Sequence, residues 1–328
     1  MLASIGSSIE GFLDAAGDFF SSLGEVGWFS LLLGLLSFLV YLTLRSRAFF
    51  HTLRAAYPGE RIPFWKIWGA YIAAYGFNNV VPARGGDVIK LFLVKTSVPN
   101  STYPAVGAAF FVEAIFDLVM GVFILTFAFS QGVFPKPPDF SKIPAFDLQF
   151  FASHPRFLLF LLTFIAVSVL VGFALLSNRV RAFWARVRQG VTILRDRRRY
   201  MREVFAWQLA GWCFRFLAFW MLLEAFNVGG SVRNVLLVLG VNAVAALVPF
   251  TPGGAGVQQA LLVKVFAGAA AGATVAAYSV GQQVAIAATT FALGFVALVF
   301  IFKIRSFREV IDRGREERAA ERGAKARA

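Results

Sequence analysis

Charged residues are scarce in this 328-residue chain. They make up 15% of it and hydrophobic residues 58%, whereas a soluble domain carries about 25% charge. That shortage argues against an ordinary soluble domain. Cys213 is the single cysteine, so there is no disulfide framework. His51 and His154 lie far apart without acidic or cysteine neighbours, so we expect no metal site. The sequence shows no nucleotide-binding loop and no paired nucleophile and base, so we expect neither a cofactor nor enzyme activity.

The chain does contain several apolar runs long enough to cross a membrane. A bilayer core of roughly 30 Å needs about 20 residues of helix. The formal net charge is +14, and the basic residues lie between and after the apolar runs, where anionic lipid headgroups would be. The charge therefore indicates a membrane surface as partner and no nucleic acid. We predict an all-α integral membrane protein, folded as a polytopic helical bundle.

The order of apolar and polar stretches predicts the organisation of the chain. Residues 1–27 contain no Lys or Arg, so we expect an amphipathic segment outside the cytoplasm. The further segments are a first repeat over 28–130 (span, hairpin 66–97, span), an external Pro-rich loop over 131–156, a connecting span over 157–177, an Arg-rich cytoplasmic amphipathic segment over 178–203, a second repeat over 204–303 (span, hairpin 234–267, span) and a cytoplasmic tail over 304–328.

The first span is expected to end at the first positive charges that follow it. It begins at Trp28 and reaches about Leu44. Loops rich in Lys and Arg belong on the cytoplasmic side. We therefore predict a basic cytoplasmic loop that carries Arg45, Arg47, Arg54, Arg61 and Lys66.

Two polar breaks, at residues 78–90 and 249–259, interrupt the apolar sequence in the same manner. Broken backbone at membrane depth is tolerated only where protein or a water-filled cavity surrounds it. A matched pair of breaks points to a transport site. Their Gly-Gly pairs lie 168 residues apart (253 minus 85), close to half the chain. We predict two inverted repeats, each containing a broken re-entrant hairpin. Two thin complete spans in place of each hairpin, and chance coincidence of the glycines and prolines, are the alternatives.

Ionisable side chains within these apolar stretches are the candidates for binding. Each costs about 2.5–3.5 kcal/mol in hydrocarbon and so needs a partner or water. Arg84 and Lys90 could receive the phosphate of a lipid headgroup, because a guanidinium grips phosphate through two donors. Glu113 and Asp117 share one helix face. With Asp87, they would orient the cations, bind a cationic headgroup or carry a proton.

The alternative for these charges is a set of internal ion pairs that fix helix packing, for instance Arg84 or Arg215 with Glu113. Backbone amides freed at the two breaks begin short helices and could face a phosphate. Amide side chains near the breaks either satisfy freed backbone groups or contact the substrate. The remaining candidate residues are Gly85, Gly86, Asn79, Gly253, Gly254, Arg215 and Gln259.

Three motifs resemble a known family. They are Asn-Val-Val-Pro-Ala-Arg-Gly-Gly-Asp-Val-Ile-Lys at 79–90, Glu-Ala-Ile-Phe-Asp at 113–117 and Pro-Phe-Thr-Pro-Gly-Gly-Ala-Gly-Val-Gln-Gln at 249–259. Over about residues 28–303 the chain resembles the lysylphosphatidylglycerol synthase transmembrane-region family. This flippase-like family is the membrane half of the bacterial multiple peptide resistance factor. The chain departs from the family pattern at Asp87, Lys90, Ala114 and Gln259, where Glu, Arg, Arg and Glu are usual.

The resemblance implies an inner-membrane lipid translocator. We expect a flippase-like transporter that moves an anionic or aminoacylated phospholipid, or a polyprenyl-phosphate lipid, by alternating access. Its N-terminus would be outside and its C-terminus in the cytoplasm of a bacterium. Its partners would be membrane phospholipids with anionic headgroups. The alternative is a non-transporting membrane scaffold that docks a separate lipid-modifying enzyme through its Arg-rich segment. The sequence leaves the oligomeric state open.

Overall fold

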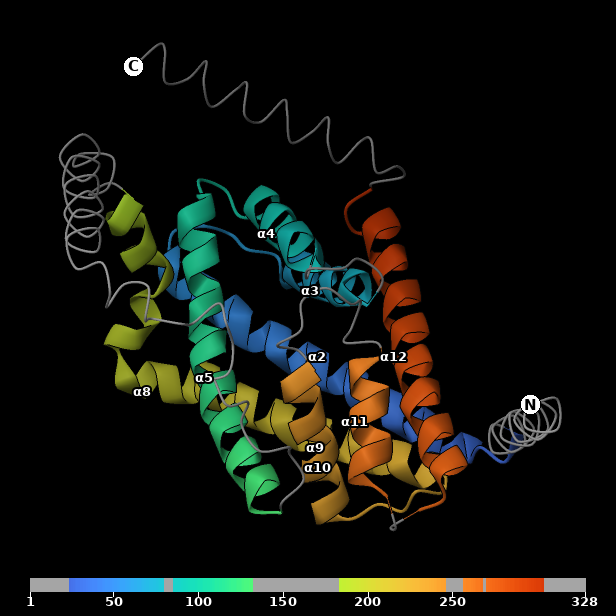
Figure 1. Ribbon diagram of the computed structural model, residues 1–328. Coiled ribbons are helices and arrows are strands. Elements are labelled where there is room, and N and C mark those ends of the chain that lie inside the picture. The colour runs from blue at the N-terminus through green and yellow to red at the C-terminus, as the bar shows by residue number, and fades with distance from the viewer. Residues whose placement is uncertain (1–23, 80–84, 132–182, 246–255, 268–269, 304–328) are drawn as a thin grey trace, which may run out of the picture.

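The computed structural model describes residues 24–79, 85–131, 183–245, 256–267 and 270–303 of the protein. Every regular element in these ranges is helical (Figure 1). Four of the helices are long and apolar enough to cross a membrane, which confirms an all-α polytopic membrane protein. The four are α2 (Trp28–Ala56), α5 (Tyr103–Ser130), α12 (Gly272–Phe300), and the continuous run of α8 (Arg197–Tyr200), η4 (Met201–Phe205) and α9 (Ala206–Ala225).

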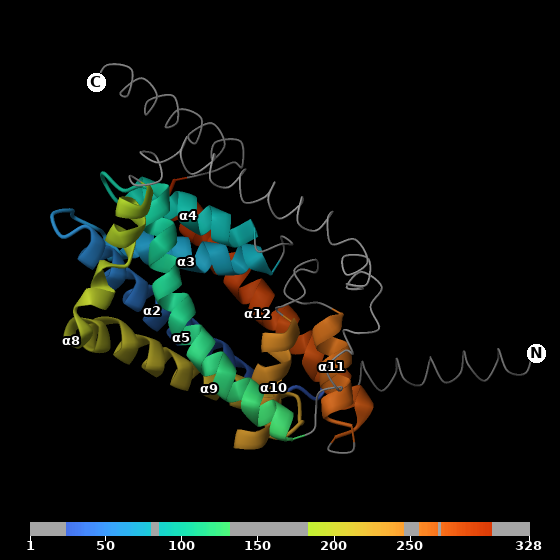
Figure 2. The ribbon, with the colours of Figure 1, turned by 60° about the vertical axis from the view of Figure 1, so that its left-hand side comes forward.

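Two pairs of shorter helices pack at opposite ends of the bundle. In Figures 1 and 2, α3 and α4 lie together at one end, and α10 and α11 lie together at the other. The members of each pair contact each other. A short η3 turn (Thr192–Arg195) precedes α8. The bounds of the pairs are Phe64–Asn78 and Gly85–Ser97 for α3 and α4, and Val232–Ala245 and Val257–Val265 for α10 and α11.

Helices α2 and α9 pack against each other along their length and run antiparallel. At one end, the Gly27 amide donates to the Ala225 carbonyl at 2.8 Å. At the other end, His51 lies 3.8 Å from Glu203 of η4. Between these contacts, Gly34 lets the two backbones approach closely, because a side chain there would press on α9. An inverted repeat requires this direction for two corresponding spans, but any up-and-down pair adopts it too. The inverted repeat therefore stays a prediction.

Each short-helix pair also packs on a long span from the other half of the chain. Helix α3 packs along α12, and α10 packs along α5. Where α3 meets α12, the backbones touch: a Cβ on Gly76 would lie 2.6 Å from the Thr290 carbonyl oxygen. One on Gly294 would lie 2.9 Å from the Ala73 Cα. Small residues allow such contact between membrane helices. The contact joins the two halves of the chain.

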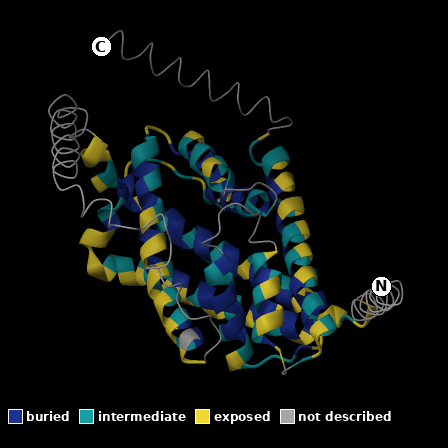
Figure 3. Cartoon of the chain, viewed as in Figure 1, coloured by how far each residue is buried: buried dark blue, intermediate teal, exposed yellow. Residues whose placement is uncertain are grey.

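The outward faces of α5 and α12 carry large apolar side chains that are exposed (Figure 3). A soluble protein would bury such faces, whereas lipid tails accept them. The spans are thus apolar toward lipid, and their polar groups gather inside the bundle. The exposed residues include Phe111, Leu118, Val122 and Phe123 of α5 and Val284, Phe295 and Phe300 of α12.

The prediction that Arg45, Arg47 and Arg54 lie in a loop after the first span is wrong. Helix α2 continues to Ala56, and Arg45 is a buried residue within it. A positive charge that follows an apolar run usually marks the end of a span, but here the helix continues through it. Arg45 is tolerated inside the helix because a carboxylate on another span neutralises it.

Several predicted segments lie outside the described residues. These are the amphipathic segment up to residue 23, the Pro-rich loop and connecting span within 132–182, and the tail from residue 304. The Arg-rich segment is described from residue 183 onward.

Candidate functional site

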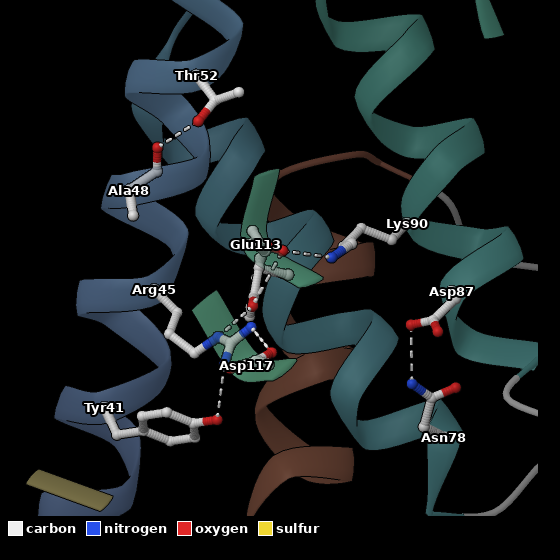
Figure 4. Close-up of polar contacts among 10 residues, drawn as sticks. Tyr41, Arg45, Ala48, Thr52, Asn78, Asp87, Lys90, Glu113 and Asp117 are labelled. Atoms are coloured by element: carbon white, nitrogen blue, oxygen red, sulfur yellow. Dashed lines mark hydrogen bonds and ion pairs between the residues drawn. The ribbon is translucent and has the colours of Figure 1, made fainter. Parts of the chain in front are cut away.

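A bidentate ion pair between Arg45 and Asp117 lies near the middle of two spans, α2 and α5 (Figure 4). The guanidinium donates from Nη1 to Oδ1 at 2.6 Å and from Nη2 to Oδ2 at 2.7 Å. The indole Nε1 of Trp212 on α9 adds a donor to Oδ1 at 3.3 Å. The Arg45 side chain is 8% exposed and that of Asp117 37%. Paired donors of this kind are strong and fix the orientation of both groups.

A second ion pair joins the first hairpin to α5. The Lys90 Nζ on α4 lies 3.4 Å from Oε2 of Glu113, and both side chains are almost fully buried. The Tyr71 hydroxyl on α3 accepts from Arg45 Nε at 2.8 Å and donates to Glu113 Oε2 at 3.5 Å. Tyr71 therefore links the two ion pairs into one network, which Figure 4 shows in part.

Aromatic rings surround the Lys90 ammonium. Its Nζ lies 4.1 Å from the ring centroid of Phe110, 4.4 Å from that of Tyr71 and 5.1 Å from that of Phe49. The faces of these rings attract a cation and hold it where little water reaches. The rings thus help to stabilise the buried positive charge of Lys90, because the Glu113 carboxylate at 3.4 Å is too far away for a strong charged hydrogen bond.

A third cation, Arg215 of α9, lies beside the network. Its guanidinium carbon lies 4.6 Å from the Trp212 ring and 5.6 Å from the Tyr41 ring. Its Nε is buried and has no hydrogen-bond partner among the described residues. We call Arg45, Lys90, Arg215, Glu113 and Asp117, with Tyr41, Tyr71 and Trp212, the charged cluster. With all groups ionised, its three cations and two carboxylates sum to one positive charge.

The structure separates the other predicted residues from this cluster. Asp87 accepts from the Asn78 amide at 3.1 Å, away from the ion pairs (Figure 4). Asn79 donates to the Tyr75 carbonyl at 3.2 Å and so satisfies backbone at the end of α3. Gly86 has a packing role, because a Cβ there would overlap the Ala74 carbonyl oxygen. Gly85 begins α4. Arg84, Gly253 and Gly254 lie outside the described residues.

Internal ion pairs are present among the described residues, whereas the predicted pair of Arg84 with Glu113 lies outside them. Among the described residues, Glu113 pairs with Lys90 and not with Arg215, which stacks on aromatic rings. Arg45, Tyr71 and Trp212 are site residues that the sequence motifs do not mark. One signal was available: Arg45 follows Tyr41 by four residues, so both lie on one face of a continuing helix.

Gln259 caps the start of α11. Its Oε1 accepts from the Gly256 amide at 2.6 Å, and its Nε2 donates to Gln283 of α12. Gly256 has a backbone φ of +84°, a conformation that residues other than glycine rarely adopt. We expect Gln259→Ala to lower the free energy of unfolding by about 1 kcal/mol, as loss of a helix cap does. Detergent-based thermal unfolding measures this. A loss of lipid binding with unchanged stability would instead make Gln259 a substrate ligand.

These features define a polytopic membrane protein whose spans bury a charged cluster near their middle. The chain belongs to the lysylphosphatidylglycerol synthase TM region family, whose model matches residues 13–294. This confirms the resemblance seen in the motifs and makes the chain a lipid-related membrane protein. No curated protein and no solved structure matches it significantly.

Proposed function

We propose that the protein moves a phospholipid or another lipid-linked phosphate between the leaflets of a bacterial inner membrane. The observation that carries the proposal is the charged cluster near the middle of the spans. Transport sites lie near the bilayer midplane, between segments of broken helix. Charges there are costly, so they usually face a bundle interior or a hydrated path and mark the route of a substrate.

The excess positive charge of the cluster supports an anionic headgroup as the substrate. Lys90 would hold the phosphate as a point charge, and the free Nε–H of Arg215 would donate to a phosphate oxygen. The two terminal nitrogens of the Arg45 guanidinium, Nη1 and Nη2, already donate to Asp117. Arg45 would therefore position Asp117 and Tyr71 rather than hold the lipid. Arg84 of the first break remains part of the proposal.

The distribution of charge supports an orientation in the membrane. The C-terminal end of α2 and the start of α9 lie at the same end of the bundle, because His51 contacts Glu203. Exposed arginines gather at that end, and positive residues favour the cytoplasmic side. The end of α12 lies there too, since Gly69 near the start of α3 contacts Ile301. We propose that this end is cytoplasmic, with the start of α2 outside. The exposed arginines include Arg54, Arg61, Arg197, Arg198 and Arg202.

The two hairpins support alternating access. The start of α3 and the end of α4 lie close together, because Asn100, which follows α4, donates a hydrogen bond of 2.8 Å to Glu60, which precedes α3. This first hairpin would enter from the cytoplasmic side, and α10–α11 from the opposite side (Figures 1 and 2). Because each packs on a span of the other half, a tilt of one half would move both hairpins in opposite senses. The cluster would then open to one side at a time.

Lys90→Met is expected to reduce lipid movement at least about tenfold, because it removes a charge-assisted contact to phosphate worth roughly 1.5–3 kcal/mol. The measurement uses the full chain in liposomes of phosphatidylglycerol and phosphatidylcholine. A fluorescent phosphatidylglycerol and a membrane-impermeant quencher report its movement between leaflets. The matched control is Lys66→Met, an exposed lysine at the start of the same hairpin, which should move lipid at the rate of the wild-type protein.

Equal rates for Lys90→Met and Lys66→Met would overturn the site. No lipid movement by the wild-type protein would favour the second candidate, a scaffold for a separate lipid-modifying enzyme. The observation behind that candidate is a shallow recess on the end proposed to be cytoplasmic, lined by Arg197, Arg198, Met201 and Arg202.

A further inference from the structure

The ion pair with Glu113 obstructs the role proposed for Lys90. Glu113 Oε2 contacts the Lys90 ammonium on one side, and three aromatic rings lie around the rest of that ammonium. A phosphate can reach Lys90 only when Glu113 gives up that contact. The state of Glu113 therefore decides whether the cluster can load an anion.

The two carboxylates of the cluster differ in how well their charge is satisfied. Both oxygens of Asp117 receive a donor from Arg45, at 2.6 and 2.7 Å, and Trp212 adds another. Glu113 receives its donors on Oε2 alone, at 3.4 and 3.5 Å, longer than the roughly 2.7–2.9 Å of a strong charged hydrogen bond. Its Oε1 is buried without a partner among the described residues. Asp117 is thus built to stay ionised, and Glu113 has a free oxygen where a proton fits.

The charges around Glu113 explain why a headgroup would favour that proton. An arriving phosphate brings a negative charge within contact distance of a buried carboxylate. Two such groups sharing one cation cannot both stay ionised without strong repulsion. Helix α10, which packs on α5, adds no charge here, because its Arg233 bonds to Gln131 near the far end of α5. The ionisable groups that face Glu113 or its network are Asp117 of α5, Arg45 and Tyr41 of α2, Tyr71 of α3, Lys90 of α4 and Arg215 of α9.

We infer that lipid movement by this protein is coupled to a proton carried on Glu113. The inference rests on the proposed function and adds the coupling ion to it. A proton from water forms an O–H bond at Glu113 Oε1 as the phosphate replaces this carboxyl group on Lys90. The same bond breaks when the lipid leaves, and the proton returns to water on the new side. One proton therefore crosses with each lipid anion.

The test uses the full chain in liposomes that contain phosphatidylglycerol and enclose a pH-sensitive dye. In these liposomes the outside solution is made more acidic than the inside, which gives a pH gradient. Protonation of Glu113 should then favour phosphate binding at least about fivefold, the lower end of typical coupling between two ligands. The initial rate of inward phosphatidylglycerol movement should rise by a similar factor. The dye should report acidification that stops when phosphatidylcholine replaces all phosphatidylglycerol. Lipid movement that ignores the gradient, without acidification, overturns the inference and leaves the proposed function standing. No lipid movement under any condition overturns both.

The variant Glu113→Gln keeps the shape of the side chain but cannot carry the proton. Its lipid movement, at whatever rate, should not respond to the gradient. Glu224→Gln and His51→Gln are the controls, because Glu224 accepts from the Gly230 amide and His51 contacts Glu203, both outside the cluster. These two should keep the response of the wild-type protein. Retention of the response in Glu113→Gln, or its loss in His51→Gln, overturns the assignment. If Glu113→Gln does not fold, the dye measurement on the wild-type protein still decides whether lipid movement is coupled to a proton.

Discussion

Arg45→Met is expected to lower the free energy of unfolding by about 3 kcal/mol, because it leaves the Asp117 charge without its partner inside the bundle. Breaking a buried ion pair by removing one member costs about 3–5 kcal/mol. The Asp117 side chain is 37% exposed, so the lower end of that range applies. Thermal or denaturant unfolding in detergent micelles measures the change.

A double variant separates the structural part of this effect from the functional part. Arg45→Met with Asp117→Leu replaces both charges by apolar groups, which is often neutral for stability. It should regain most of the lost stability but not lipid movement in liposomes. The control is Arg47→Met on the same helix. Arg47 lies over the Phe50 and Phe64 rings at 5.2 and 5.0 Å, so its loss should cost less than about 1 kcal/mol. A double variant as unstable as Arg45→Met would contradict the ion-pair explanation.

Gly76→Val is expected to destabilise the protein by about 3 kcal/mol, the upper part of the usual range for overpacking. A Cβ at this position would lie 2.6 Å from the Thr290 carbonyl oxygen and 2.8 Å from the Phe291 Cα. Both are backbone atoms of α12, so no side chain can rotate away. The two helices must separate, and this removes the main contact of the first hairpin with the last span.

Gly121→Val is the matched control for this experiment. Gly121 lies in α5, and a Cβ there would meet nothing within 4 Å. The substitution should change stability by only a few tenths of a kcal/mol, since valine is a slightly better helix former than glycine. Comparing the melting temperatures of the two variants in one detergent isolates the helix contact. If the two variants melt alike, close packing of α3 on α12 does not hold the hairpin.

Gln259 shows how a residue type can point to a site without deciding its role. As a polar residue in the second break, Gln259 is predicted from the sequence to contact the substrate. In the structure its side chain serves the Gly256 amide and Gln283. A backbone amide without a helical partner and a lipid headgroup can both bond to a polar side chain. A polar residue at a break therefore looks the same in the sequence whichever of the two it serves. Only the three-dimensional structure, which places Gln259 within hydrogen-bond distance of the Gly256 amide, distinguishes a capping role from substrate contact.

The class of this protein follows from its amino-acid sequence, because apolar run length and low charge reflect the thickness and polarity of a bilayer. The sequence also locates the first break and the carboxylates Glu113 and Asp117, since charges in apolar sequence are rare and costly. Their partners were decided by the tertiary structure alone. Arg45 and Lys90 lie 72 and 23 residues from their carboxylates, on different helices. Helical periodicity gives the face on which a residue lies, whereas the packing of small residues such as Gly76 and Gly34 sets which faces meet.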